Sequence, residues 1–189
     1  MTTKGIFNSM DDWYYKGVAY QRQKRYSEAV KAYKQALIEK PKSAKCWYNL
    51  GNSFIKLHQN EEALDALKEA IILNPQYLLA FLKKGNILLK KHNYREAIDE
   101  YNSALKIHPH FFDALYYKGL CYEKMTRHTE AEIFYNKVLT IDPLHVKANL
   151  RKGIVLIKDR RYIPGIKSIC NTFSASVQLM YYSVKSKIA

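Results

Sequence analysis

The sequence predicts an all-helical protein built from a repeated pair of helices. Seven glycines and five prolines are few for 189 residues, and the runs rich in Ala, Leu, Lys and Glu favour helix over strand. A second observation is a period of 34 residues that recurs along the chain. This period is carried by Gly17, Gly51, Gly85, Gly119 and Gly153, by Ala29, Ala63, Ala97 and Ala131, and by Pro41, Pro75, Pro109 and Pro143.

Each period contains the same order of aromatic, small and proline residues. The first period has Trp13, Gly17, Tyr20, Ala29, Tyr33, Ala36 and Pro41, and the second has Trp47, Leu50, Gly51, Phe54, Ala63, Leu67, Ala70 and Pro75. These residues resemble the tetratricopeptide repeat, in which W-x2-L-G-x2-Y is followed by A-x3-F and then by P. The resemblance covers residues 10–158. It implies a right-handed α-α superhelical solenoid of stacked helix-turn-helix units.

The register divides the chain into seven segments. They are an N-terminal tail (1–9), four full repeats (10–43, 44–77, 78–111 and 112–145), a degenerate fifth repeat (146–171) and a C-terminal capping helix (172–189). The fifth repeat departs from the pattern at Pro164 and Gly165, and it lacks the closing proline. We expect residues 163–188 to be helical, with a possible break near Asn171, and to cover the last apolar face of the array. A chain that continues beyond residue 189 is the open alternative.

Within each repeat, small residues at the eighth and twentieth places let two antiparallel helices approach closely. Larger residues are expected to fill the remaining space, with Tyr20, Phe54, Leu88, Tyr122 and Leu156 meeting Tyr33, Leu67, Tyr101, Tyr135 and Ile169. Each proline disfavours helix at the residue before it, so the second helix should end there. The acidic residues Glu28, Glu62, Glu96 and Glu130 should lie in the first turn of the second helices, where the helix dipole favours them.

The resemblance also implies a concave surface lined by the first helix of each pair. Its residues, transferred by register, form a candidate peptide-binding groove of aromatic, aliphatic, amide and basic side chains. They are Tyr14, Val18, Arg22, Tyr48, Asn49, Asn52, Lys56, Leu82, Lys83, Asn86, Lys90, Tyr116, Tyr117, Leu120, Lys124, Lys147, Leu150, Arg151 and Lys158. The alternative is that these side chains only pack helix against helix.

A basic residue stands at the thirteenth place of every repeat, at Arg22, Lys56, Lys90, Lys124 and Lys158. Stacked helices lie about 8–10 Å apart, which matches an acidic residue every ~3 residues of an extended peptide. This basic ladder therefore favours an anionic ligand. A solvated helix end is the alternative, because the dipole also favours Lys near a helix C-terminus.

Some members of the family grip a terminal carboxylate with a clamp of Lys, Asn, Asn, Lys and Arg. The best window here supplies Asn86, Lys147 and Arg151, but Leu82 and Tyr117 replace two clamp residues. The pattern therefore favours at most a secondary anion site, in which Arg151 would present its planar fork to a carboxylate.

Other kinds of site find little support in the sequence. Three widely spaced cysteines argue against a disulfide framework or a zinc site and fit a reducing, cytoplasmic setting. His58 and His92 occupy equivalent places, and His108 and His110 flank a proline, but no third metal ligand stands at a suitable spacing. We expect no cofactor, no metal and no membrane insertion, and no motif of a catalytic nucleophile or phosphate loop occurs.

These features favour a non-enzymatic scaffold that binds an acidic peptide segment with apolar anchors. The formal net charge of +14 and the 16 tyrosines leave RNA or another polyanion as an alternative ligand. A docking arm of a larger assembly is the third possibility.

Overall fold

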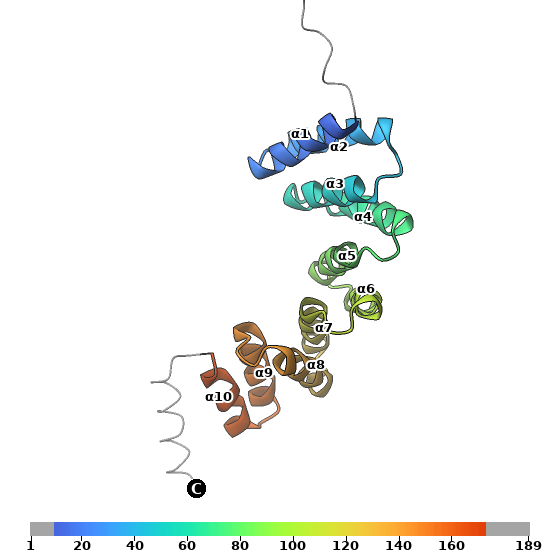
Figure 1. Ribbon diagram of the computed structural model, residues 1–189. Coiled ribbons are helices and arrows are strands. Elements are labelled where there is room, and N and C mark those ends of the chain that lie inside the picture. Colours follow the sequence, from blue (N-terminus) through green and yellow to red (C-terminus); the bar gives the residue numbers. More distant parts are fainter. Residues whose placement is uncertain (1–9, 173–189) are drawn as a thin grey trace, which may run out of the picture. The chain divides into compact units, whose positions relative to one another are not determined.

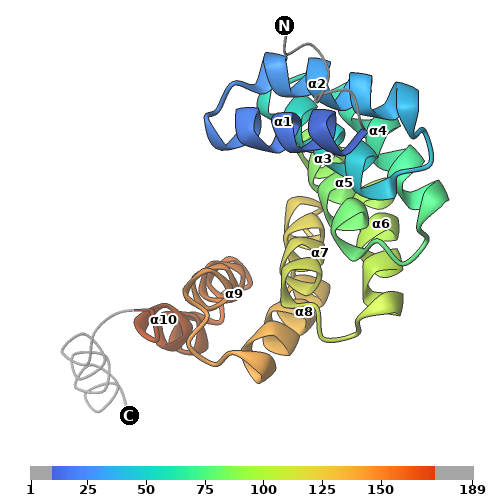
Figure 2. The ribbon, with the colours of Figure 1, turned by 45° about the horizontal axis from the view of Figure 1, so that its top comes forward.

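The computed structural model describes residues 10–172, which form α-helices joined by short turns (Figures 1 and 2). The described helices are α1 (Met10–Arg22), α2 (Tyr26–Glu39), α3 (Ala44–Lys56), α4 (Asn60–Leu73), α5 (Leu78–Lys90), α6 (Tyr94–Ile107), α7 (Phe112–Lys124), α8 (His128–Ile141), α9 (Val146–Lys158) and α10 (Tyr162–Cys170). The prediction of an all-helical fold is confirmed. The described residues form two compact units, which divide within α5 between Ile87 and Leu88.

In the first unit, α1 packs on α2 and α3 packs on α4. Each contact forms where a glycine of the first helix faces a large side chain of the second. A Cβ built on Gly17 would lie 2.5 Å from a ring carbon of Tyr33, and one on Gly51 would lie 3.0 Å from Leu67 Cγ. Tyr33 and Leu67 are completely buried, so they fill the space that each glycine leaves.

The second unit repeats this arrangement in the pairs α7 and α8, and α9 and α10. A Cβ on Gly119 would lie 2.9 Å from the Tyr135 ring, and one on Gly153 would lie 2.4 Å from Ile169 Cγ1. Tyr122 packs against the cluster that contains Tyr135, as expected, and its ring stacks on Phe134 at 5.5 Å between centroids.

The turn between the two helices of a repeat has one conformation throughout the described chain. Its central residue has a positive φ of 59–63° and is never glycine, the residues being Lys24, His58, His92, Thr126 and Arg160. The next N–H donates to a carbonyl five residues earlier, as Arg25 does to Tyr20 (2.9 Å) and Arg127 to Tyr122 (2.9 Å). This is the Schellman arrangement, which satisfies the last carbonyls of the first helix.

In two of these turns a guanidinium group replaces the apolar contact that often accompanies the motif. Arg25 lies 4.7 Å from the centroid of the Tyr20 ring, and Arg127 lies 4.9 Å from that of Tyr122. Each arginine also binds the glutamate three residues later, Glu28 at 2.9 Å and Glu130 at 2.7 Å. These glutamates lie in the first turns of α2 and α8, where acidic residues were expected.

The second helices end beside the prolines. Residue Lys40, directly before Pro41, is already non-helical, with φ −136° and ψ 78°, and Asn74, His108 and Asp142 have similar backbone angles. The last described helix, α10, ends at Cys170 and contains Pro164 in its first turn, where a missing N–H is tolerated. The N-terminal tail and residues 173–189, including most of the expected capping helix, lie outside the described residues.

Candidate binding surface

Every basic-ladder residue is the final residue of a first helix and is exposed. Arg22, Lys56, Lys90, Lys124 and Lys158 end α1, α3, α5, α7 and α9, respectively. A cation at this place interacts favourably with the negative end of the helix dipole. The position therefore contributes to helix stability and also leaves the ammonium or guanidinium group open to solvent.

The side chains at the fifth place of each repeat are not uniformly exposed. Tyr14 and Leu82 are buried, at 8% and 6% exposure, whereas Leu150 is 39% exposed. Tyr14 lies against the Tyr33 ring at 5.9 Å, and Tyr116 lies against Tyr135 at the same distance. The expected continuous row of exposed apolar side chains is thus interrupted where rings turn inward to pack between the helices.

The other predicted groove residues differ in exposure. Lys147 is exposed, and the half-buried set is Val18, Tyr48, Asn49, Asn52, Lys83, Asn86, Tyr117, Leu120 and Arg151. Tyr48 packs on Tyr77 at 4.9 Å, and Tyr117 stacks on Tyr101 at 6.0 Å. Whether any of these residues binds a peptide stays a prediction.

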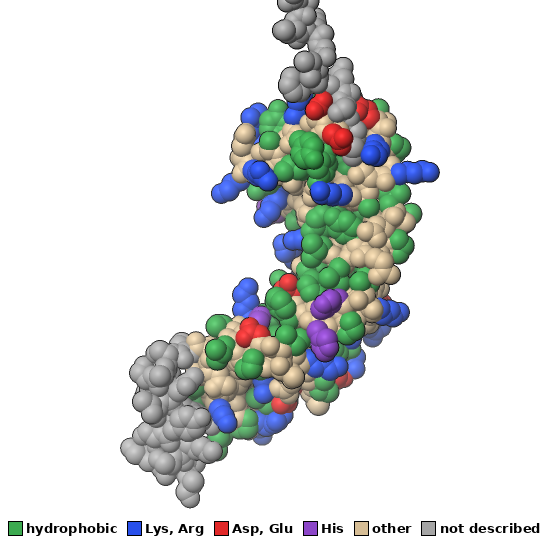
Figure 3. Space-filling view, viewed as in Figure 1, with side chains coloured by type: hydrophobic (Ala, Val, Ile, Leu, Met, Phe, Trp, Pro, Cys, Tyr) green, Lys and Arg blue, Asp and Glu red, His purple; other side chains and the backbone are tan. Residues whose placement is uncertain are grey.

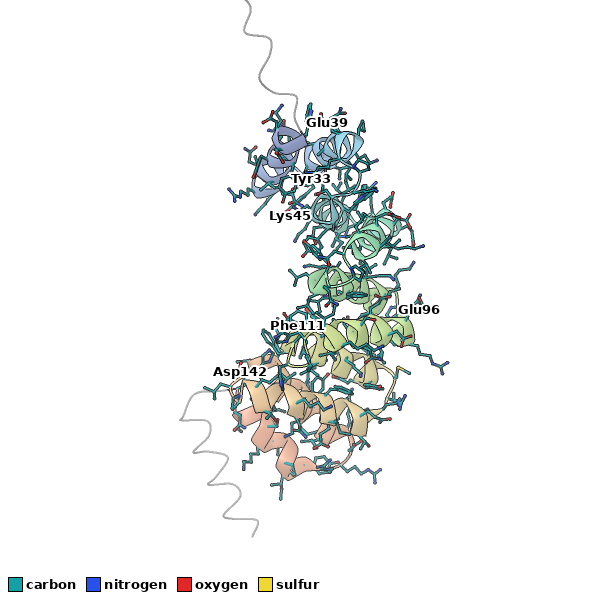
Figure 4. All side chains as sticks on the ribbon, turned by 45° about the vertical axis from the view of Figure 1, so that its right-hand side comes forward. Tyr33, Glu39, Lys45, Glu96, Phe111 and Asp142 are labelled. Carbon is teal, nitrogen blue, oxygen red and sulfur yellow. The ribbon has the colours of Figure 1, made fainter. Side chains whose placement is uncertain are left out.

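Polar side chains join the first two repeats in the first unit. Gln21, on α1, accepts a hydrogen bond from the Tyr33 hydroxyl (2.9 Å) and donates to Ser53 Oγ (2.8 Å) and to the Asn49 carbonyl (3.0 Å). Asn49 Nδ2 in turn donates to the Tyr14 hydroxyl at 2.9 Å. Tyr33 is labelled in Figure 4. The predicted groove residues Tyr14 and Asn49 therefore fix the contact of α1 with α3.

The second unit has a charged version of this network. The Tyr135 hydroxyl donates to Glu123 Oε2 at 2.7 Å, and Arg151 donates to Glu123 Oε1 at 3.2 Å. The Glu123 side chain is only 4% exposed. Burial, together with the charge of Glu123, raises the pKa of Tyr135, which keeps its hydroxyl a donor.

Sequence reasoning did not identify Glu123 as important. A signal was present, since the same place in the other repeats holds Gln21, Ile55, Leu89 and Ile157, and Glu123 is the only ionisable residue there. The pairing also changes the interpretation of Arg151. Because its guanidinium already binds a buried carboxylate, Arg151 is a weaker candidate for the secondary anion site.

The described residues contain no group of three or more His, Cys, Asp or Glu side chains placed to hold a metal ion. His92 Nδ1 lies 2.7 Å from the Tyr94 hydroxyl, so this histidine has a local partner. Within residues 10–172, no helix has the length and apolar character needed to cross a bilayer. Lys and Arg side chains are scattered over several helices on the face shown in Figure 3.

Comparison with known proteins identifies two family models along the chain. Residues 4–70 match the model described as anaphase-promoting complex, cyclosome, subunit 3, and residues 82–146 match the tetratricopeptide repeat. None of the curated protein sequences matches the chain.

Several solved structures resemble the chain over most of its length. MamA from Desulfovibrio magneticus RS-1 is 17% identical with a TM-score of 0.78, and the match covers 94% of this chain and 96% of that one. YrrB, described as a TPR protein with an unusual peptide-binding site, is 18% identical with a TM-score of 0.74 over 93% of each chain. Pseudomonas aeruginosa PilF is 18% identical with a TM-score of 0.75, over 95% of this chain and 83% of that one. At these identities the similarity shows a shared fold.

Proposed function

Because the chain belongs to the tetratricopeptide-repeat family, we propose that it is a non-enzymatic scaffold whose first helices bind a peptide segment of a partner protein. Repeats of this family generally serve protein–protein interaction. The finer proposal is that the segment is acidic and carries apolar anchors. It rests on one observation, which is the exposed cation that ends every described first helix.

The clearest surface of this kind in the second unit lies on α7 and α9, which contact each other. On α7, Tyr116, Leu120 and Lys124 follow one another at intervals of four residues and therefore share one helix face. On α9 the equivalent residues are Leu150, Ile154 and Lys158. An extended peptide across this face would meet apolar side chains first and a pair of cations at one edge.

In the first unit, the equivalent candidate peptide-binding surface lies on α1 and α3 and is more polar. There Tyr48, Asn52 and Lys56 share a face of α3, and Lys45 lies 5.3 Å from the centroid of the Tyr14 ring. Lys45 is labelled in Figure 4. Amide groups such as that of Asn52 suit the backbone of a bound peptide, since they both donate and accept hydrogen bonds.

A binding assay with labelled peptides tests the proposal. We expect a peptide that alternates Asp or Glu with Leu or Phe to bind more tightly than its Lys-substituted counterpart, because its acids would face the basic ladder. Lys124→Glu/Lys158→Glu should weaken binding at least tenfold. The matched control, Lys31→Glu/Lys68→Glu, makes the same charge change on second helices, where both lysines are exposed, and should leave binding unchanged. Equal loss in both variants would contradict the role of the ladder.

RNA or another polyanion is the second candidate, supported by the formal charge of +14. Its affinity would fall steeply with salt and would respond equally to both double variants, because phosphate contacts depend on total charge. Competition between a single-stranded RNA and the acidic peptide separates the two functions. We also propose a cytoplasmic location, supported by Cys46, Cys121 and Cys170, which are free and buried.

A further inference from the structure

Helices α6, α7 and α8 of the second unit surround an open pocket of about 570 Å³. Its walls combine apolar side chains with lysines and small polar groups. The lining residues are Asp99, Asn102, Ser103, Leu105, Lys106, Pro109, Leu115, Lys118, Phe134 and Lys137. Pockets that hold small organic ligands have volumes of about 300–1,000 Å³. This pocket falls inside that range.

The pocket faces away from the proposed peptide surface. Lys118 follows Tyr116 by two residues, which is about 200° around a helix, so the two side chains leave α7 on opposite sides. On α6, Asp99, Asn102 and Lys106 are spaced at three and four residues and share the face that lines the pocket. A ligand here would not compete directly with one on Tyr116.

Two lysines lie beside one aromatic ring in this pocket. Lys118 Nζ is 4.3 Å from the centroid of the Phe134 ring, and Lys137 Nζ is 5.1 Å from the same centroid. Lys118 also donates to Asn102 Oδ1 at 2.6 Å. An ammonium group carries three N–H donors, and Asn102 accepts only one of them. The half-buried Lys118 is thus fixed in position and keeps donor capacity toward the pocket.

The charges in the pocket are not balanced. Lys106, Lys118 and Lys137 line it together with a single acid, Asp99. Burial, reinforced by the nearby charge of Lys137, lowers the pKa of Lys118, and Asp99 only partly opposes this. A bound anion would relieve the repulsion between the lysines and compensate for the lost hydration of Lys118.

An earlier repeat shows that packing does not require a lysine at this place. Leu50 stands two repeats before Lys118 in the same register, and it is buried at 2% exposure. The place of Leu115 is taken there by the larger Trp47, and that of Phe134 by Ala66. A buried leucine therefore suits this fold. Lysine nevertheless recurs at this place, at Lys16, Lys84 and Lys152, so the feature that sets this repeat apart is the second lysine, Lys137, whose place in the other repeats is held by Gln35, Glu69, Ser103 and Asn171.

We propose that this pocket binds a small organic monocarboxylate, with the carboxylate between Lys118 and Lys137 and an apolar body against Leu115. The two ammonium groups supply charge-assisted hydrogen bonds, and Leu105, Leu115 and Phe134 supply apolar contact. Asp99 disfavours a dianion such as phosphate, since it places a like charge in the same pocket. None of the residues that line the pocket is an arginine, which would suit phosphate better than lysine does.

Titration of the full chain with 3-phenylpropionate, followed by NMR of backbone amides, tests the proposal. We expect saturable shifts at residues of α6, α7 and α8 around the pocket. The uncharged 3-phenylpropanamide and inorganic phosphate should each bind at least tenfold more weakly. N-acetylphenylalanine resembles the C-terminus of a peptide. Comparing its affinity with that of 3-phenylpropionate distinguishes a peptide end from a small organic acid as the natural source of the carboxylate. We expect 3-phenylpropionate to bind more tightly.

Two variants at residue 118 make the test specific. Lys118→Leu, which copies the residue of the earlier repeat, should preserve the helical circular dichroism spectrum and weaken 3-phenylpropionate binding at least tenfold. Lys118→Arg should retain most of the affinity. Binding of the acid and the amide with equal affinity would overturn the proposal, as would a folded Lys118→Leu protein with unchanged affinity or an absence of saturable shifts in the wild type.

Discussion

Replacing Gly17 by alanine should destabilise the protein, whereas the same change at Gly51 should be nearly neutral. The new Cβ at residue 17 would lie 2.5, 2.7 and 2.8 Å from three carbons of the Tyr33 ring. Comfortable carbon contacts are about 3.5–4.0 Å, so the ring would have to move by roughly 1 Å. Tyr33 is completely buried, and its hydroxyl is tied to Gln21 at 2.9 Å. Movement therefore strains the core and stretches that hydrogen bond.

Two opposing effects determine how much stability Gly17→Ala loses. Overpacking of this kind costs about 1–3 kcal/mol, and a weakened hydrogen bond costs about 1 kcal/mol more. Alanine stabilises the helix by about 1 kcal/mol relative to glycine because of its better helix propensity. The expected net loss for Gly17→Ala is therefore about 1–3 kcal/mol. At Gly51 the new contacts are 3.0 and 3.2 Å, to the branched end of Leu67, which needs to move only a few tenths of an ångström. At this position the cost of overpacking and the gain in helix propensity nearly cancel.

Urea and thermal unfolding of the two variants, followed by circular dichroism, provide the measurement. A change of 1 kcal/mol shifts Tm by about 2–4 °C in a chain of this size, so Gly17→Ala should melt ~2–12 °C below the wild type. The Gly51→Ala protein should stay within a few degrees of it. If both variants lost the same stability, the explanation based on ring contact would be wrong.

Three further predictions follow from buried or strained groups. Glu123→Ala should lower the free energy of unfolding in urea by about 2–4 kcal/mol, because it leaves Tyr135 and Arg151 without their shared acceptor. Glu123→Gln should cost less. Equal losses in the two variants would argue against Glu123 as that shared acceptor. Thr126→Gly should stabilise the protein by about 1 kcal/mol, since Thr126 has a φ of 59° that glycine adopts without strain. A loss of stability in this variant would refute the reasoning. Burial raises the pKa of Cys46 and Cys121 to about 12, well above that of an exposed thiol, so the unfolded chain releases these protons first. The free energy of unfolding should accordingly fall between pH 9 and 12, and replacing both cysteines by alanine should reduce that slope.

The fold could be predicted because one period fixes many residues at once. Gly17 and Tyr33 belong to a pattern that repeats every 34 residues, so a single glycine-to-ring contact predicts its equivalents in the other repeats. The prolines likewise marked the ends of the second helices, because the residue before a proline avoids helical angles.

The candidate site was harder to predict because register places a residue on a helix face but not its rotamer or partner. Tyr14 belongs to the predicted groove by position, yet its ring turns inward to Tyr33. Arg151 was considered as an anion ligand, and its partner Glu123 lies 28 residues away in sequence. The pocket around Lys118 was missed for the same reason, since three separate helices supply its walls.

Arginine pairing also affects how the protein would respond to a polyanion. Arg25, Arg127, Arg151 and Arg161 each hold a carboxylate, of Glu28, Glu130, Glu123 and Glu132, respectively. An arginine that already pairs with a carboxylate is less able to neutralise a phosphate, so it releases fewer of the counterions condensed on a nucleic acid. The number of salt ions displaced by a nucleic acid would therefore fall below the number suggested by the 31 Lys and Arg residues. A partner approaching this protein would be attracted chiefly by lysine.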